Sequence, residues 1–367
     1  MMETYGRLDP FLETIVAMHG TDLLLTTNSV PLVRLEGTLR PVEELPIVDH
    51  DLMSELLAAV LIGDQRQQFI DDRDIDFALS FGESRFRGNA FFQRGRPAIA
   101  LRLMHNIIPT FDEIGLPHSI RSLASMHQGL VLFTGPTGSG KSTSMATLVD
   151  EINRTRPCHI ITIEDPIEYL HGNQRAVVHQ REVGFDAKSF DRALKSALRE
   201  DPDVVLVGEM RDLESIAITL TLAETGHLVI SSLHTNDAPQ ALDRIVDVFP
   251  AERQAQVRMQ LASVLSAVVA QRLVPRIGGG MVAAYEALIA TSAVSNLVRE
   301  GKTRQLRNAM QMGIGQGNQT LEMSLNALVA NGLITQADAI ATAFVPQDIE
   351  GSNISSLNPA SATGAYS

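Results

Sequence analysis

The sequence predicts an α/β protein of two domains: an α+β domain at the N-terminus, then a domain with a largely parallel sheet and a helical C-terminal part. Three observations lead to this prediction. The chain has 367 residues, more than a single core usually accommodates. Its first third alternates short strand-like runs with turn residues. From Gly129 onward, apolar strand-like runs are followed by helical patterns, as in α/β domains.

The domain boundaries follow from turn residues and from local composition. We expect the first domain at residues 1–108 and the second at 109–345. Pro109, Gly115 and Pro117 punctuate a connection at about 109–127, which we interpret as the linker. Residues 346–367 are polar and rich in Ser and Asn, so we expect a disordered tail there.

Hydrophobic periodicity predicts the elements of the first domain. Helical patterns lie at residues 10–19 and 51–69. Strand patterns lie at 21–27, 30–37, 74–82, 85–95 and 98–104. Asp72, Asp74, Asp76 and Glu83 have the spacing of a calcium-binding loop, but Phe77 occupies the position where that loop requires glycine. We therefore predict a solvated strand face here.

In the second domain, helical patterns dominate from about residue 252 to 343. They are broken by three glycines at 278–280 and by a glycine-rich turn between helices at 313–317. The apolar run MQLASVLSAVVAQ, residues 259–271, is shorter than the roughly 18 residues that a membrane span needs. We expect a buried helix there and no insertion into a membrane.

Composition and charge exclude some classes of function. The net charge of −13 argues against a protein that wraps nucleic acid. The first 20 residues carry Glu3, Arg7, Asp9 and Glu13 instead of a basic start and an apolar run, so we expect no secretory signal peptide. The single cysteine, Cys158, cannot form an internal disulfide, which fits a reducing cytosol.

The sequence GPTGSGKS at residues 135–142 matches the phosphate-loop pattern G-x-x-x-x-G-K-[ST] in full. It follows the strand-like run GLVLFT and opens a helical pattern, which is the context that such a loop requires. Its backbone N–H groups would surround phosphate oxygens. Lys141 would reach the β- and γ-phosphates, and the Ser142 hydroxyl would ligate Mg²⁺. The sequence therefore predicts binding of ATP and ADP.

Three further apolar runs end in the polar residues Glu164, Glu209 and His234. Because the carboxyl ends of parallel strands share one sheet edge, we expect these side chains to converge with Lys141 on one nucleotide. Hydrolysis requires a carboxylate for the attacking water, an acidic group that organises Mg²⁺ and water, and a donor near the γ-phosphate. We assign these roles to Glu209, Glu164 and His234 in that order. His227, at the start of the last run, is a second candidate.

Four segments resemble the Walker A, Asp box, Walker B and His box of the type II/type IV secretion ATPase superfamily. They read GPTGSGKST, ITIEDPIEYLH, QREVGFDAKSFDRALKSALREDPDVVLVGEMRD and ETGHLVISSLHTNDAPQALDRIVDVFPAE. The resemblance runs from about residue 3 to 345 and is strongest to the pilus-retraction branch. It implies a PAS-like N-terminal domain followed by a RecA-like ATPase domain. Gly208 stands where many ATPases carry an aspartate, and the family shares this glycine before the catalytic glutamate.

The resemblance also assigns site residues. It places Mg²⁺ at Ser142 and, through water, at Glu164 and Glu209, and it places the His box at His227 and His234. Family members bring arginines of the N-terminal domain to the nucleotide, and among Arg94, Arg96 and Arg102 we favour Arg94 and Arg102 as catalytic. It places the nucleotide on Gly135, Pro136, Thr137, Gly138, Ser139, Gly140, Lys141, Ser142 and Thr143.

The function that the resemblance implies is ATP hydrolysis coupled to retraction of type IV pili. It further implies a cytoplasmic homohexamer at the inner face of the cytoplasmic membrane that acts on an inner-membrane platform protein, alone or with a second retraction ATPase. The run AVSNLVREGK, residues 293–302, resembles a helix that retraction requires, with Ser295 in place of arginine. The alternatives are a pilus-assembly or type II secretion ATPase of the same superfamily and a regulatory ring that does not hydrolyse ATP.

Overall fold

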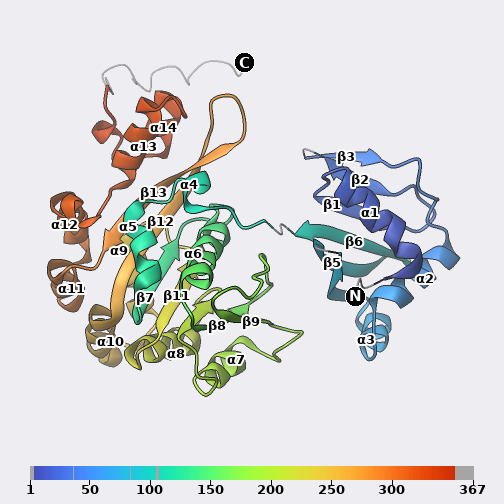
Figure 1. Ribbon diagram of the computed structural model, residues 1–367, viewed down its shortest axis with the longest axis horizontal. Coiled ribbons are helices and arrows are strands. Elements are labelled where there is room, and N and C mark those ends of the chain that lie inside the picture. Colours follow the sequence, from blue (N-terminus) through green and yellow to red (C-terminus); the bar gives the residue numbers. More distant parts are fainter. Residues whose placement is uncertain (1–3, 36, 83, 105–106, 352–367) are drawn as a thin grey trace, which may run out of the picture. The chain divides into compact units, whose positions relative to one another are not determined.

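The structure is a computed structural model that describes residues 4–35, 37–82, 84–104 and 107–351 (Figure 1). The chain forms two compact units. The first comprises the residues up to Ile107 together with Glu168–Leu170, and the second comprises Ile108–Ile167 and the residues from His171 onward. The mixture of sheets and helices is the α/β architecture that the sequence predicts.

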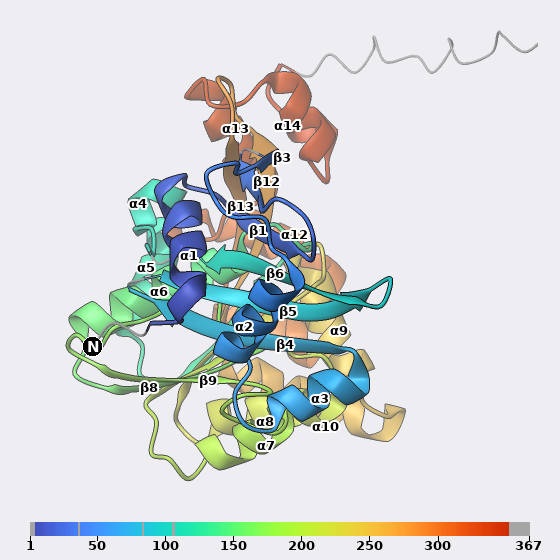
Figure 2. The same cartoon turned by 90° about the vertical axis from the view of Figure 1, so that its right-hand side faces the viewer.

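The first unit contains an antiparallel six-stranded sheet with the order β3-β2-β1-β6-β5-β4. Its helices α1, α2 and α3 contribute to a single apolar core with alternate residues of the strands (Figure 2). The predicted helix at 51–69 is two helices, separated by a bend at Gly63, whose φ is +55°. The elements are η1 Gly6–Leu8, α1 Asp9–Ala17, β1 Asp22–Thr26, β2 Leu32–Leu35, β3 Thr38–Pro41, α2 His50–Val60, α3 Gln65–Asp72, β4 Asp74–Phe81, β5 Ser84–Gln93 and β6 Arg96–Met104.

Two of the carboxylates with calcium-loop spacing lie on a strand face, as the alternation predicts, whereas Asp72 ends helix α3. Asp74 and Asp76 belong to β4, and both accept hydrogen bonds from Asn89 Nδ2 of β5, at 2.6 and 3.0 Å. Phe77, the residue after Asp76, is buried in the core. Glu83 lies outside the described residues.

The second unit contains a seven-stranded sheet with the order β13-β12-β7-β11-β10-β8-β9, in which only the edge strand β13 is antiparallel. The four apolar runs that precede the predicted site form its neighbouring strands β7, β11, β10 and β8. The strands are β7 Gly129–Thr134, β8 His159–Glu164, β9 Val177–Glu182, β10 Val204–Val207, β11 Leu228–Leu233, β12 Leu265–Pro275 and β13 Met281–Ile289.

The predicted buried helix at 259–271 is wrong in its second half. Helix α10, Ala251–Val264, ends within this run, and β12 begins at Leu265. Residues of β12 pair with β7 on one side and with β13 on the other. A short apolar run fits a buried strand and a buried helix equally well, and here the two flanking strands decide the outcome. The three glycines at 278–280 lie in the turn of the β12–β13 hairpin.

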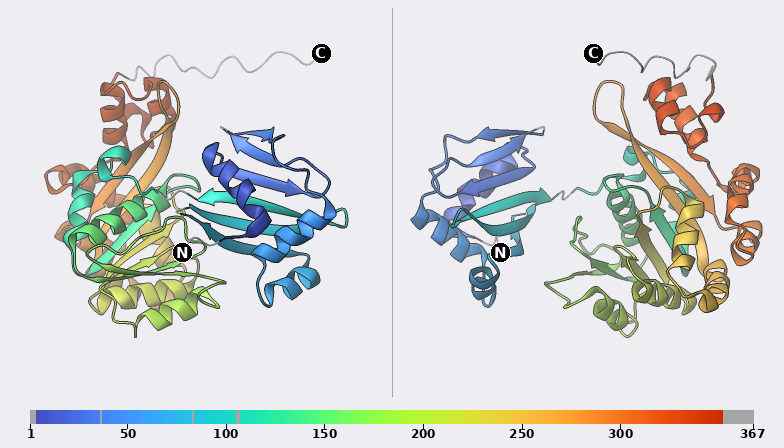
Figure 3. Two further views of the ribbon diagram at one scale, coloured as in Figure 1. Left: turned by 45° about the vertical axis from the view of Figure 1, so that its right-hand side comes forward. Right: turned by 180° about the vertical axis from the view of Figure 1, so that it is seen from behind.

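Helices cover both faces of this sheet (Figure 3). Alternate strand residues divide between two cores: Leu130 and Leu132 face one, and Val131 and Phe133 face the other. Helices α7 to α12 contribute to the first core, and α4, α5 and α6 to the second. The helices are α6 Lys141–Thr155, α7 Phe190–Ala197, α8 Leu213–Glu224, α9 Ala238–Asp247, α10, α11 Ser292–Arg299 and α12 Leu306–Met312.

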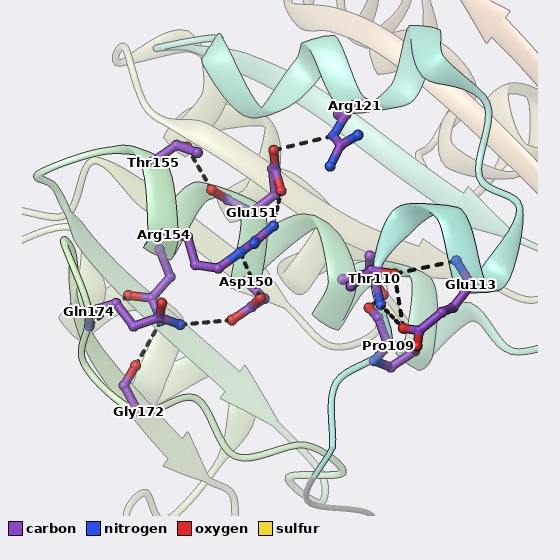
Figure 4. Close-up of polar contacts among 12 residues, drawn as sticks. Pro109, Thr110, Glu113, Arg121, Asp150, Glu151, Arg154, Thr155, Gly172 and Gln174 are labelled. Atoms are coloured by element: carbon purple, nitrogen blue, oxygen red, sulfur yellow. Dashed lines mark hydrogen bonds and ion pairs between the residues drawn. The ribbon is translucent and has the colours of Figure 1, made fainter.

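The segment interpreted as a linker, 109–127, packs in the second unit. It forms α4 Phe111–Ile114, α5 His118–Arg121 and the 3-10 helix η2 Ser122–Ser125, and its apolar residues belong to the core beneath α6. Polar contacts tie it to α6. Thr147 Oγ1 donates to Pro109 O at 2.9 Å. Arg121 Nε donates to Glu151 Oε1 at 3.3 Å (Figure 4). Pro and Gly here mark breaks between short helices, not a free connection.

A small core at the C-terminal end joins the β12–β13 hairpin to the last helices. It contains residues of α13 Leu321–Ala330 and α14 Gln336–Thr342, and between α12 and α13 lies the 3-10 helix η4 Ile314–Gln316 at the predicted glycine-rich turn.

The prediction that disorder begins at residue 346 is wrong for the first residues of that segment. Residues Pro346–Asp348 form the 3-10 helix η5, and Ile349, which follows it, is buried in the small C-terminal core. Residues 352–367 lie outside the described residues. No helix in the described ranges is long and apolar enough to cross a membrane.

Candidate functional site

The phosphate loop joins the end of β7 to the start of α6. Gly135, Gly138 and Gly140 have φ values of +143°, +77° and +87°, a region that L side chains rarely adopt. The ammonium group of Lys141 donates to the carbonyl oxygens of Gly135 and Pro136, at 2.8 and 3.0 Å. The loop is therefore curled around the lysine that would meet the phosphates.

His234 and Glu209 lie beside this lysine at the carboxyl ends of β11 and β10. His234 Nε2 is 3.0 Å from Glu209 Oε1, and His234 Nδ1 is 3.4 Å from Lys141 Nζ. An ammonium group can only donate, so Nδ1 accepts from Lys141. The structure thus brings three of the predicted site residues into one row, with neighbouring polar atoms 3.0 and 3.4 Å apart.

The second oxygen of the Glu209 carboxylate is held by Arg211. Arg211 Nε donates to Glu209 Oε2 at 2.8 Å, and Arg211 Nη1 lies 3.4 Å from Asp165 Oδ2. The hydrogen bond to Glu209 and the charge of that carboxylate raise the pKa of Arg211. The Glu209 side chain retains 24% exposure, so water can reach a carboxylate that Arg211 orients.

Glu164 ends β8, next to β10 in the sheet. Its Oε1 accepts hydrogen bonds from Thr162 Oγ1 at 2.6 Å and from Gln180 Nε2 at 3.2 Å. Gln180 Oε1 in turn accepts from the backbone N–H of His171 at 2.8 Å. Glu164 is therefore oriented by its own strand and by β9.

Gly208 occupies a place that has no room for an aspartate. A Cβ atom added at Gly208 would lie 3.1 Å from Ile163 O and 3.4 Å from Glu164 Cα. The Gly208 N–H also donates to Ile163 O at 2.9 Å, which fixes this approach of the two strand ends. The glycine therefore allows Glu164 and Glu209 to lie on adjacent strand ends.

His227 lies away from this row, and Arg94 and Arg102 belong to the first unit. His227 precedes β11, at the opposite edge of the sheet from His234, and its Nδ1 lies 2.9 Å from Leu222 O. A strand of this length separates its ends by roughly 20 Å. The structure therefore does not bring His227 to the site. Arg94 lies in the β5–β6 turn of the first unit with a φ of +50°, and Arg102 of β6 donates to Asp22 Oδ1 at 2.8 Å.

Several residues of the site carry no sequence pattern of their own. Arg211 and Gln180 act through their contacts with Glu209 and Glu164. Gln271 of β12 packs beneath the phosphate loop, and Ser144 donates to it. The sequence placed Gln271 in a predicted helix, and only the pairing of β12 with β7 could have revealed it.

The arrangement fits a nucleoside triphosphate. A loop of positive-φ glycines, a buried lysine and a helix N-terminus form an anion site. In the part of the chain that the structure describes, Ser139 Oγ is buried without a hydrogen-bond partner and so can donate to a phosphate oxygen. Carboxylates of two adjacent strand ends and the Ser142 hydroxyl supply the oxygen ligands that suit Mg²⁺.

Comparisons with known proteins find similar chains over most of this sequence. Residues 34–304 match the family described as type II/IV secretion system protein. The chain is 45% identical over 330 residues to the type IV pilus retraction ATPase PilT of Pseudomonas aeruginosa, covering 90% of this chain and 96% of the relative. It is 41% identical over 343 residues to the type IV pilus ATPase PilU of the same organism, covering 93% and 90%. The crystal structure of the pilus retraction motor PilT with bound ADP matches with a TM-score of 0.88 and 44% identity, covering 95% of this chain and 99% of that one.

Proposed function

The chain belongs to the type II/IV secretion system protein family and is an ATPase, and from this premise we propose that it is the motor that retracts type IV pili. The observation that carries the proposal is the row formed by Lys141, His234 and Glu209 at one sheet edge. It places a phosphate-binding cation, a donor and a carboxylate where the γ-phosphate would lie. The pilus as the substrate rests on the likeness to PilT.

The phosphate loop binds the nucleotide through its backbone N–H groups and Lys141. Ser142 would ligate Mg²⁺ directly, and Glu164 and Glu209 would do so through water. Mg²⁺ held by these residues would offset the negative charge of the phosphates. Thr162 and Gln180 orient Glu164 for this task.

Glu209 orients the attacking water and accepts its proton. The water oxygen forms a bond to the γ-phosphorus, the bond to the oxygen shared with the β-phosphorus breaks, and ADP and phosphate leave. His234 Nε2, which lies 3.0 Å from Glu209 Oε1 in this structure, would donate to a γ-phosphate oxygen as charge develops there. Arg211 keeps one carboxylate oxygen oriented during this exchange.

The assembly and the partners belong to the same proposal. The protein forms a homohexamer in the cytoplasm, at the inner face of the cytoplasmic membrane, and acts on the inner-membrane platform protein of the pilus. Arg94 and Arg102 complete the nucleotide site of a neighbouring subunit, so that hydrolysis depends on assembly. We expect no nucleic-acid partner.

A strain carrying Glu209→Gln tests the proposal. The variant keeps the side-chain volume but removes the base, so ATP turnover should fall by about 10²-fold or more while ADP binding persists. Cells should then carry surplus pili that do not retract. Glu252→Gln, an exposed position at the start of α10, is the matched control and should behave as wild type.

The outcomes separate the alternatives. Loss of pili in the Glu209→Gln strain would identify an assembly or secretion motor. Purified protein whose phosphate release equals that of the variant would identify a regulatory ring without turnover and would overturn the enzymatic assignment. Unchanged turnover in Lys141→Ala would refute the phosphate loop itself.

A further inference from the structure

Gln271 of β12 lies directly beneath the phosphate loop. Ala270 pairs with Thr134, the last residue of β7, so the next residue along β12 lies beside Gly135, where the loop begins. The Gln271 side chain is buried, with the residue only 3% exposed. A buried carboxamide at this place needs polar partners, and it finds them in the loop and in α6.

The two outer glycines of the loop pack against Gln271. A Cβ atom added at Gly135 would lie 2.4 Å from Gln271 O, and one added at Gly140 would lie 2.7 Å from Gln271 Nε2. At Gly135 the clash would be with the backbone carbonyl of residue 271, whereas at Gly140 it would be with the Gln271 carboxamide. The Gln271 side chain therefore packs against Gly140, the last glycine of the loop, whose φ is +87°.

A hydrogen bond connects Gln271 to the first turn of α6. Ser144 Oγ donates to Gln271 Oε1 at 2.8 Å, and Ser144 is fully buried. Ser144 lies three residues after Lys141, on the same side of the helix. The bond thus fixes the start of α6, which carries Lys141 and Ser142, against β12.

The strand that carries Gln271 is itself held in place. β12 pairs with β7 and β13 on its two sides. The next residue, Arg272, donates from Nη1 to Thr342 O at 3.2 Å, and its guanidinium lies 4.5 Å from the ring centre of Phe344. A side chain on such a support can orient a loop without moving itself.

We propose that Gln271 is a positioning residue for nucleotide binding, whose side chain acts through Gly140 and Ser144 to hold the phosphate loop in its phosphate-accepting shape. The inference rests on nucleotide binding at this loop, as the proposed function requires. Gln271 has no part in the bond-breaking step, so its loss should raise the Kd for ADP and the KM for ATP more than it lowers kcat.

Binding of Mg²⁺-ADP to the full-length protein tests this role. Gln271→Met keeps the volume and removes the acceptor, and Ser144→Ala removes the donor. Each should raise the Kd about tenfold, and the double variant should be no weaker than either single one, because both remove the same bond. Ser231→Ala is the control, since Ser231 Oγ is buried in β11 without a hydrogen-bond partner among the described residues. It should leave the Kd unchanged.

A purely structural role predicts a lower unfolding midpoint with an unchanged Kd of the folded protein, and this result would overturn the proposal. Additive losses of about a hundredfold in the double variant would also overturn it. If Gln271→Met does not fold, Ser144→Ala decides alone. Lys141→Ala separates failure of the nucleotide site from failure of the Gln271 proposal. Unchanged ADP binding by Lys141→Ala would refute the nucleotide site itself. Lost ADP binding by Lys141→Ala together with an unchanged Kd for Gln271→Met would refute only the role of Gln271.

Discussion

The imidazole Nε2 of His234 lies 3.0 Å from the carboxylate Oε1 of Glu209. His234 directly follows β11, and Glu209 lies two residues beyond the end of the neighbouring parallel strand β10, so the sheet sets their separation. The other ring nitrogen accepts from Lys141, which fixes the tautomer. The histidine therefore links the phosphate-binding lysine to the proposed base.

Replacement of His234 should show its role in the chemical step. His234→Ala removes both the orientation of Glu209 and a donor for the γ-phosphate, so kcat should fall by about 10²-fold with a smaller change in KM. Steady-state ATP hydrolysis measures both parameters. His227→Ala is the matched control, because His227 lies at the other end of β11. An equal loss in the two variants would contradict the assignment.

Adding a side chain at Gly208 should lower both the stability of the protein and its ATP turnover. Ile163 O lies 3.1 Å from the position of an added Cβ, so Gly208→Ala must push the ends of β8 and β10 apart. We expect a loss of about 1–3 kcal/mol in the free energy of unfolding together with reduced turnover. Denaturant unfolding measures the first, and Gly172→Ala, where no atom lies within 4 Å, is the control. Equal stability of both variants would show that the strand ends accommodate the methyl group.

The arginines of the first unit should affect turnover but not binding by isolated subunits. We expect Arg94→Ala with Arg102→Ala to lower ATP hydrolysis at least tenfold, because a cation that completes a neighbouring site acts on the transition state. Arg102 donates to Asp22, which also lies 3.4 Å from Arg34 Nε, so Asp22 keeps a partner in the variant. Arg96→Ala is the control. Full ATP hydrolysis by the double variant would show that Arg94 and Arg102 are not the arginines that complete a neighbouring nucleotide site.

Glu286 should make stability depend on pH. It is buried and accepts from Ala238 N at 2.9 Å, and burial raises its pKa from 4.5 to about 7 despite the charge of Arg307. Between these values the folded chain binds more protons than the unfolded one. The stability that protonated Glu286 contributes is therefore complete below about pH 4.5 and is lost as the pH rises through 7.

Glu286→Gln keeps an acceptor for Ala238 N and removes the ionisation. Relative to the variant, wild type should lose about 3 kcal/mol in the free energy of unfolding between pH 4.5 and 7.5. Urea unfolding at a series of pH values measures this difference, with Glu252→Gln as an exposed control. Parallel curves for wild type and Glu286→Gln would contradict a raised pKa at this carboxyl.

Most of the fold could be predicted because its signals are local. The phosphate loop, the alternation in β4 and the apolar runs of β7, β8, β10 and β11 are each readable within a few residues. Predictions failed where a local pattern fits more than one structure. The apolar run 259–271 divides between α10 and β12. The Pro- and Gly-punctuated segment 109–127 forms short helices that pack against α6.

The sequence by itself determined the chemistry at the ends of the strands: a lysine, two glutamates and a histidine, each of which directly follows an apolar run or lies in the loop that follows one. The order of strands in the sheet, which depends on contacts between distant segments, decided which of these side chains meet. It joined His234 to Glu209 and left His227 at the far edge. It also brought Gln271 beneath Gly135 and Gly140 across more than a hundred residues of chain, a relationship that no local pattern can encode.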